Sequence, residues 1–353
     1  MKVAVVGVGL IGGSIGLAAR QRLGAHVCGY DPSAGALEAA IARGAIAESC
    51  RSLEAAVADA DFAFVAAPVH VLSGVVEDVL AVAGDACVVS DVGSVKRAVA
   101  GAVSNPRFIG GHPLAGAETA GVEHARADLF ADATWYLTPT PNTVGVAYER
   151  LHRFITRIGA WPTAVEPETH DVIMASVSHL PHVLANVLVA QAARVLGEER
   201  LPATGPSFRD VTRVAGANSA VWGGIYAANA DALVAAIDDL VARLGVVREQ
   251  LAAADDVGIA AWNDSARDDR RRLLEAGLAG GEVHELRVLV PNRPGIVAEI
   301  ALALGRATID IVDMGLYPSS GSHGTVALWI RGAVVAEQAE HLVRELGLEV
   351  VRA

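Results

Sequence analysis

The chain has 353 residues, of which 52% are hydrophobic, and it carries a formal net charge of −12 at pH 7. This length allows two or three domains, and the apolar content supports large cores. The negative charge argues against nucleic acid or an anionic membrane as a partner, because both require a basic protein surface.

The same composition indicates a cytoplasmic protein. No run approaches the ~18 uninterrupted apolar residues that a membrane span needs, and the first expected strand starts at Lys2, which leaves no room for a signal peptide. Cys28, Cys50 and Cys87 are odd in number and lack a Cys-x-x-Cys pairing. We therefore expect reduced, mostly buried thiols and no metal site.

The N-terminus reads as an apolar strand, a glycine-rich turn and the start of a helix. Gly7, Gly9 and Gly12 have the Gly-x-Gly-x-x-Gly spacing. This spacing gives a tight turn, a close approach of the backbone to a pyrophosphate, and a helix N-terminus that faces the phosphates. The motif alone is weak evidence in a chain with 36 glycines.

The context of the turn favours NAD as the cofactor. A second expected strand, His26–Tyr30, ends on Asp31, about 20 residues after the glycines. A carboxylate there accepts hydrogen bonds from ribose hydroxyls and repels a 2′-phosphate, so NAD is favoured over NADP. A glycine-rich turn without a cofactor is the alternative. The residues assigned to NAD are Gly7, Gly9, Leu10, Ile11, Gly12, Asp31 and Pro68.

Periodicity divides the chain into three domains. Strands and helices alternate over residues 1–166, which indicates an α/β domain with a mainly parallel sheet and ligands at the carboxyl ends of its strands. Residues 167–276 read almost entirely as helix and predict a domain that also forms a subunit interface. Residues 277–282 are a glycine-rich hinge. Residues 283–353 follow the βαββαβ pattern of a ferredoxin-like unit and predict a third, separate domain.

Two segments at the expected carboxyl edge of the sheet carry side chains suited to chemistry. Ser94 and Lys96 lie where a core strand passes into a helix, and the N-cap of that helix is the alternative role for Ser94. His112 follows a short strand within the glycine-rich segment 110–116. Its ordinary pKa suits a general base for an alcohol that is being oxidised. A histidine hydrogen-bonded within a loop is the alternative.

The expected helical domain contains two further polar groups. His179 and His182 are three residues apart, on one face of a helix that Pro181 opens or kinks. No third ligand for zinc accompanies them, so an anion site is favoured. Arg209 and Arg213 are four residues apart. They form either a solvated, ion-paired helix face or, in a cleft, a clamp for a substrate carboxylate.

These motifs resemble those of prephenate and arogenate dehydrogenases in order and spacing. They are Gly7-x-Gly9-x-x-Gly12-Gly13-Ser14, Gly93-Ser94-Val95-Lys96, Gly110-Gly-His112-Pro-x-Ala-Gly116, Ser178-His-Leu-Pro-His182 and Phe208-Arg-Asp-Val-Thr-Arg213. Residues 283–353, with Asn292-Arg-Pro-Gly295, resemble an ACT domain, a small-molecule regulatory module. The resemblance covers essentially the whole chain. It implies a Rossmann-like NAD-binding domain, an all-α dimerisation domain and a C-terminal ACT domain.

The resemblance also implies an activity, the NAD-dependent oxidative decarboxylation of prephenate to 4-hydroxyphenylpyruvate in tyrosine biosynthesis. His112 would accept the proton of the substrate hydroxyl. Ser94 would hydrogen-bond near that hydroxyl and near His112. A homodimer is implied, with tyrosine as an effector at the ACT domain. The implied substrate-binding residues are His179, His182, Arg213 and Trp222, the last contributed by a partner subunit at the rim of the site.

Several alternatives stay open. Arogenate could replace prephenate or be used beside it, and Glu118 is the candidate residue for that choice. Ala117 and Gly223-Gly224 depart from residues common in the family, which leaves substrate gating undefined. The β-hydroxyacid dehydrogenases share the N-terminal motif but use a lysine in the second domain, and this chain has none after Lys96. The last alternative is an amino-acid sensor whose dehydrogenase site is inactive. The intact catalytic motifs argue against it.

Overall fold

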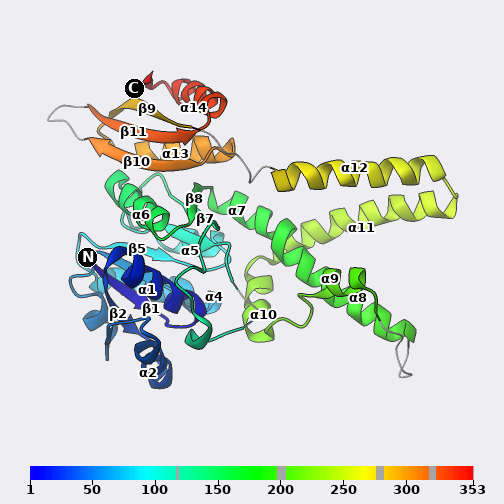
Figure 1. The fold of residues 1–353 in the computed structure, drawn as a ribbon, viewed down its shortest axis with the longest axis horizontal. Coiled ribbons are helices and arrows are strands. Elements are labelled where there is room, and N and C mark those ends of the chain that lie inside the picture. Colours follow the sequence, from blue (N-terminus) through cyan, green and yellow to red (C-terminus); the bar gives the residue numbers. More distant parts are fainter. Residues whose placement is uncertain (117–118, 197–203, 276–281, 318–322, 353) are drawn as a thin grey trace.

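The computed structural model describes residues 1–116, 119–196, 204–275, 282–317 and 323–352 (Figure 1). Ala117, Glu118 and the hinge Gly277–Gly281 lie outside the described residues, so the predictions that concern them stay predictions. Along the chain an α/β region is followed by a long helical region and then by a small C-terminal α/β unit.

The N-terminal region contains a parallel five-stranded sheet. Its strands are β1 (Lys2–Val6), β2 (His26–Tyr30), β3 (Glu48–Ser49), β4 (Phe62–Val65) and β5 (Val88–Asp91), in the order β3-β2-β1-β4-β5. The connecting helices are α1 (Leu10–Leu23), α2 (Ala34–Arg43), α3 (Leu53–Val57) and α4 (Val69–Val82). The strand order reverses between β1 and β4, and such a switch point forms the ligand site of doubly wound folds. The predicted Rossmann-like architecture is confirmed.

Burial on both faces explains why β1 is apolar throughout. Val3 and Val5 pack into one core cluster with residues of α1, while Ala4 and Val6 pack into another with residues of α4. All four side chains are buried. A strand covered on both faces reads as a continuous apolar run, as this one does.

A second sheet continues from β5. Its strands β6 (Gly110–Pro113), β7 (Thr134–Thr138) and β8 (Trp161–Ala164) lie in that order, and a parallel bridge between Val89 and Phe108 joins the two sheets. The helices of this part are α5 (Arg97–Ala102), the 3-10 turn η1 (Val122–His124) and α6 (Gly145–Arg157). The sequence pattern did not predict β3, which has two residues, or β8, where Pro162 is unusual for a strand.

The helical region begins with one long helix. It consists of α7 (Pro167–Met174), a π-helical turn η2 (Ala175–His179) and α8 (Leu180–Leu196). The helix does not open at Pro181; the disturbance is the wider turn just before it. Proline lacks the N–H of the helical ladder, and π turns are frequent at functional sites.

The described part of this region contains four more helices. They are α9 (Pro206–Thr212), α10 (Ser219–Ala228), α11 (Ala230–Ala252) and α12 (Asp256–Glu275). The prediction that this region is mostly helical is therefore confirmed. Figure 1 shows α11 and α12 as a hairpin that projects from the rest of the chain.

Many apolar side chains of the helical region face solvent in a single chain. One helix, Pro167–Val195, is long and apolar enough to cross a membrane by length and composition, with a mean hydropathy of 1.6 and 22% of that window buried. Exposed apolar residues of the region include Val177, Val187, Leu188, Val241, Leu244 and Leu251. A surface of this kind marks an interaction site.

The C-terminal unit has the element order βαββαβ. It comprises β9 (Val283–Pro291), α13 (Ile296–Arg306), β10 (Ile311–Tyr317), β11 (His323–Arg331), α14 (Ala333–Glu345) and β12 (Glu349–Arg352). The strands form an antiparallel sheet in the order β10-β11-β9-β12. This is the ferredoxin-like arrangement.

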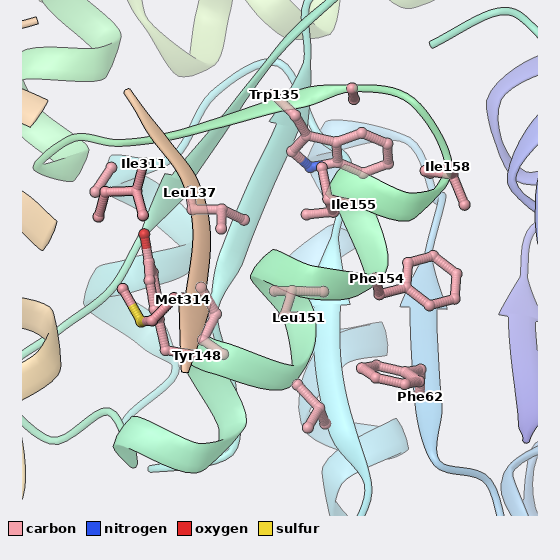
Figure 2. Close-up of a cluster of buried hydrophobic side chains, with 14 of the residues drawn as sticks. Phe62, Trp135, Leu137, Tyr148, Leu151, Phe154, Ile155, Ile158, Ile311 and Met314 are labelled. Atoms are coloured by element: carbon pink, nitrogen blue, oxygen red, sulfur yellow. The ribbon is translucent and has the colours of Figure 1, made fainter. Parts of the chain in front are cut away.

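The C-terminal unit packs directly against the N-terminal region. Its buried residues and those of the N-terminal region form one continuous hydrophobic cluster. Figure 2 shows Ile311 and Met314 of β10 beside Leu137 and Tyr148 of the N-terminal region. A Cβ at Gly305 of α13 would collide with the carbonyl oxygen of Ala164, so helix and strand pack in backbone contact.

Polar contacts accompany this apolar interface. The Arg153 guanidinium donates to the carbonyl of Met314 at 2.8 Å, and the Thr163 hydroxyl donates to Asp310 at 2.8 Å. Arg306 Nε donates to Glu166 at 2.5 Å. Sequence periodicity could not show this docking, because each surface reads as the ordinary apolar face of its own element.

Candidate active site

The glycine turn has the geometry that the sequence predicted. Gly7 has a φ of +93°, and its N–H donates to the Tyr30 carbonyl at 2.8 Å. A Cβ at Gly7 would collide with the Ala66 carbonyl, and one at Gly12 with the Gly7 carbonyl. A Cβ at Gly9, by contrast, would meet no described atom within 4 Å. Gly9 therefore leaves space in front of the α1 N-terminus, where a pyrophosphate fits.

Asp31 holds the turn from the end of β2. One of its carboxylate oxygens accepts the Val8 N–H at 3.0 Å, and the other accepts the Ser33 N–H at 2.9 Å. A carboxylate has about four acceptor positions, so two remain for ribose hydroxyls. Leu10 and Ile11 open α1, and Pro68 is the N-cap residue of α4 at the neighbouring strand end. The predicted cofactor residues thus lie along the carboxyl edge of the sheet.

His112 is linked to a histidine that the sequence analysis did not select. It lies half-buried on β6, and its Nδ1 is 2.9 Å from Nε2 of His170 on α7. His170 Nδ1 in turn is 2.7 Å from Oδ1 of Asp171. Both His170 and Asp171 are fully buried. The three side chains form a relay that runs from the helical region into the sheet edge.

The relay fixes the position of each proton. Burial, then the neighbouring His170 and Lys96, hold the pKa of His112 well below its ordinary value, so the imidazole is neutral at pH 7. The Asp171 carboxylate accepts the Nδ1–H of His170, which leaves His170 Nε2 as an acceptor for the Nδ1–H of His112. Nε2 of His112 therefore carries the free lone pair, as a general base requires.

Asp171 also joins the two regions of the chain. Its carboxylate accepts the backbone N–H groups of Lys96 at 2.8 Å and Arg97 at 3.0 Å. Although burial disfavours the charged form, the hydrogen bonds from His170 and from these two N–H groups lower the pKa of Asp171. Asn229 Nδ2 donates to the Asp171 carbonyl at 2.7 Å. Asp171 is thus a charged anchor for the start of α5.

A buried ion pair braces the loop that carries Ser94. Lys96 pairs with Asp91, and both side chains are fully buried. Asp91 also accepts the N–H of Gly93 at 2.8 Å and that of Gly111 at 3.2 Å. Burial lowers the pKa of Lys96, and the Asp91 carboxylate opposes this effect. The pair ties the Ser94 loop to the strand that carries His112.

Ser94 is not the N-cap of the following helix. α5 starts at Arg97, and its N-cap residue is Lys96. Ser94 instead lies half-buried in the loop between Asp91 and Lys96. The alternative structural role considered for this hydroxyl is therefore wrong.

The histidines of the π-helical turn and of α8 meet aromatic side chains of α10. The His182 ring stacks on Trp222 with 3.5 Å between centroids, and the His179 ring meets the same indole edge-on at 6.1 Å. His179 is buried, and Asn229 Nδ2 lies 3.2 Å from its Nδ1. Burial lowers the pKa of His179 to about 4 and also lowers that of His182. Both rings are neutral at pH 7.

Arg213 lies close enough to His182 to contribute to the lowering of the His182 pKa, after burial. Nδ1 of His182 is buried, and none of the described residues offers it a hydrogen bond. Arg209 is exposed on α9. The structure thus gathers His182, Arg213 and Trp222. Arg213 is exposed, as Arg209 is. Trp222 reaches His182 within a single chain.

Sequence reasoning missed His170, Asp171, Asp91 and Asn229. The adjacent pair His170-Asp171, in the first turns of a helix that begins with Pro167, was the available signal. Asp91 at the end of a buried strand was another. Asn229 offered none, because its role depends on how α11 packs against α7.

A dinucleotide-binding turn and a histidine relay at the same sheet edge define a dinucleotide-dependent dehydrogenase. Residues 15–162 match the family model "Prephenate dehydrogenase, nucleotide-binding domain", and residues 166–262 match "Prephenate dehydrogenase, dimerization domain". The chain is 31% identical to the prephenate dehydrogenase of Bacillus subtilis over 88% of this chain and 87% of that protein. It is also 31% identical to the cyclohexadienyl dehydrogenase of Zymomonas mobilis, over 72% and 89% of the two chains.

Solved structures agree with these matches. Prephenate dehydrogenase from A. aeolicus, in complex with hydroxyphenyl propionate and NAD+, superimposes with a TM-score of 0.73 at 27% identity, over 77% of this chain and 98% of that chain. Synechocystis arogenate dehydrogenase gives a TM-score of 0.68 at 27% identity, over 77% of this chain and 100% of that chain. The chain belongs to the prephenate dehydrogenase family.

Proposed function

We propose that the protein catalyses the NAD-dependent oxidative decarboxylation of prephenate to 4-hydroxyphenylpyruvate. The observation that carries the proposal is the relay from Asp171 through His170, which leaves Nε2 of His112 as a neutral base at the cofactor edge. The family and its relatives support the substrate class.

The reaction follows from the position of the free lone pair. His112 Nε2 accepts the proton of the substrate C4 hydroxyl as hydride leaves C4, and bound NAD supplies the acceptor for that hydride. The bond between C1 and its carboxylate breaks, carbon dioxide leaves, and its electron pair enters the ring. The proton returns to the oxygen as the ring becomes a phenol. The imidazolium formed on the way is stabilised because His112 Nδ1–H still donates to His170.

Substrate carboxylates are assigned to the group around His182. Arg213 supplies the positive charge, since His179 and His182 are neutral before substrate binds. His182 stacks on Trp222 and lies next to Arg213, so it orders the group around the guanidinium. Charge-assisted hydrogen bonds to a guanidinium are stronger than neutral ones, so Arg213 sets the affinity.

Arogenate is the second candidate substrate, because it differs from prephenate only in an amino group in place of the side-chain keto group. An arogenate dehydrogenase and a cyclohexadienyl dehydrogenase are among the relatives. Steady-state assays of NADH formation with each substrate and with NAD or NADP test the proposal. Absence of turnover with both substrates and both cofactors would overturn it.

We also propose that the protein is a homodimer built on its helical region. Exposed apolar residues on α8 and α11, such as Val187 and Leu244, supply a surface that a second copy would cover. The match to a dimerisation domain over residues 166–262 supports this use. Light scattering coupled to size-exclusion chromatography tests it, and a mass equal to one chain across a wide concentration range would overturn it.

We propose, finally, that residues 283–353 are an ACT domain that binds tyrosine. The βαββαβ order supports this, while the N–H of Gly295 in the expected binding turn already donates to the Thr143 carbonyl at 3.3 Å. A signal from this unit would travel through the Arg306–Glu166 contact, because Glu166 precedes α7, the helix of His170. Tyrosine inhibition of the full chain, compared with Arg306→Ala, tests both points. Inhibition that is purely competitive with substrate would overturn them.

A further inference from the structure

A group of metal-ligating side chains lies on the edge of the N-terminal sheet, away from the candidate active site. His26 and Cys28 are on β2, and Glu48 is on the neighbouring strand β3. Cys28 and Glu48 are direct partners in the strand register, and His26 is two residues before Cys28, on the same face. One ligand atom of each side chain lies within 4.8 Å of the others.

The distances among these atoms fit a tetrahedral ion. His26 Nε2 is 3.3 Å from Glu48 Oε2, and Cys28 Sγ is 3.8 Å from the same oxygen. The usual bond lengths around zinc place a nitrogen and an oxygen ligand about 3.4 Å apart and a sulfur and an oxygen ligand about 3.6 Å apart. Both distances to Glu48 Oε2 are therefore within about 0.2 Å of those expected for ligands of one ion.

Charge and exposure also suit a divalent ion. Burial raises the pKa of the Cys28 thiol to about 11, so an ion must displace its proton to bind. The resulting thiolate and the Glu48 carboxylate would together balance two positive charges, and His26 adds a neutral nitrogen. Cys28 is buried at 1% exposure, while the side chains of His26 and Glu48 are 54% and 60% exposed. The site is thus open to solvent on one side, where water can take the fourth position.

We propose that His26, Cys28 and Glu48 form a zinc-binding site that is distinct from the dehydrogenase site. A set of one nitrogen, one sulfur and one carboxylate oxygen selects zinc among the abundant divalent ions, since magnesium and calcium prefer oxygen ligands alone. The site lies toward the amino end of β2, whereas Asp31 follows its carboxyl end. Metal binding there stabilises the β2–β3 edge and leaves turnover unchanged.

Cobalt(II) titration of the chelator-treated, reduced full chain tests the proposal. Cobalt bound to a thiolate gives a charge-transfer band in the near ultraviolet, and zinc added afterwards should abolish it. Cys28→Ser should abolish the band, and Glu48→Gln and His26→Ala, at exposed positions, should each weaken cobalt binding at least about tenfold. Cys87→Ser is the matched control because Cys87 is a buried free thiol just before β5 of the same sheet.

The control variant and the site variants are expected to differ in cobalt binding. Cys87→Ser should bind cobalt as the native chain does. The absence of the band in the native chain, a band that survives Cys28→Ser, or equal loss in Cys87→Ser would overturn the site. Cys28 and Cys50 share a small buried cluster, so thiol counting before reduction checks that both are free thiols.

Discussion

The imidazole rings of His112 and His170 are joined by a hydrogen bond of 2.9 Å, although they come from different regions of the chain. His112 belongs to the sheet edge that faces the cofactor turn, and His170 belongs to the first helix of the helical region. The orientation of the base is therefore set by the packing of one region against the other. A movement of α7 would therefore change the orientation of the His112 ring.

The first prediction concerns the base. His112→Asn should lower kcat by about 10²–10⁴-fold while substrate still binds, because asparagine fills similar space but cannot accept the proton. Single-turnover formation of NADH measures the chemical step, and calorimetry measures substrate binding. Near-native turnover at all pH values would exclude His112 as the base.

The second prediction concerns the positioning residue His170. His170→Leu should lower kcat by about 10²-fold or more, since His112 then loses the acceptor that fixes its tautomer. His170→Gln keeps an acceptor oxygen and should recover part of the activity. The acid limb of the pH–rate profile should move in His170→Leu, because the neighbouring ring contributes to the lowered pKa of His112.

The control for His170 is His152→Leu. His152 is also a fully buried histidine, but it lies on α6 and packs near Tyr148 rather than His112. The His152→Leu variant should keep kcat within about twofold of the native value, as expected for a residue outside the site. If both leucine variants lowered kcat equally, loss of folding would explain the result and the relay would have no catalytic role.

The third prediction concerns the substrate carboxylate. Arg213→Ala should raise KM by about 10–100-fold, equivalent to about 1.5–3 kcal/mol for one charge-assisted contact, with little change in NAD affinity. Arg209→Ala, an exposed arginine on the preceding turn, is the matched control and should behave as the native protein does. Equal weakening of substrate and NAD binding would point to a folding role for Arg213.

The fourth prediction concerns cofactor choice. Asp31→Ser should narrow the preference for NAD over NADP by about tenfold or more, equivalent to about 1.4 kcal/mol, because the repulsion of a 2′-phosphate is removed. The affinity for NAD should also fall, since the Val8 N–H loses its acceptor. Ratios of kcat/KM for the two cofactors measure the effect. A native protein that prefers NADP would contradict the assignment.

The fifth prediction concerns stability and pH. Burial lowers the pKa of His152 to about 4, below its ordinary value of 6.5. The unfolded chain binds a proton there at higher pH than the folded chain does, so folding is favoured above pH 6.5 and loses stability as the pH falls toward 4. The loss from this residue reaches about 3 kcal/mol. Urea unfolding at several pH values should show a shallower loss in His152→Leu, and an unchanged slope would contradict the prediction.

Local spacing predicted the features that depend on short stretches of chain. The glycine turn and Asp31 lie where the motifs placed them, because each is set by a strand end and the loop that follows it. His112 lies on β6 itself rather than in a loop after a short strand. His170 was missed because its partner lies 58 residues away and meets it only when α7 docks on the sheet. The register that brings His26 beside Glu48 was likewise hidden, since β3 has two residues and gives no periodic signal.

The common core of the N-terminal region and the C-terminal unit has a consequence for how the chain folds during synthesis. α6 and β8 are complete once residue 164 has been made, yet α13 and β10, which cover them, follow more than a hundred residues later. The N-terminal region must therefore wait, with part of its apolar surface exposed, until the last residues leave the ribosome. A chain cut after residue 275 would keep that surface exposed permanently and should aggregate.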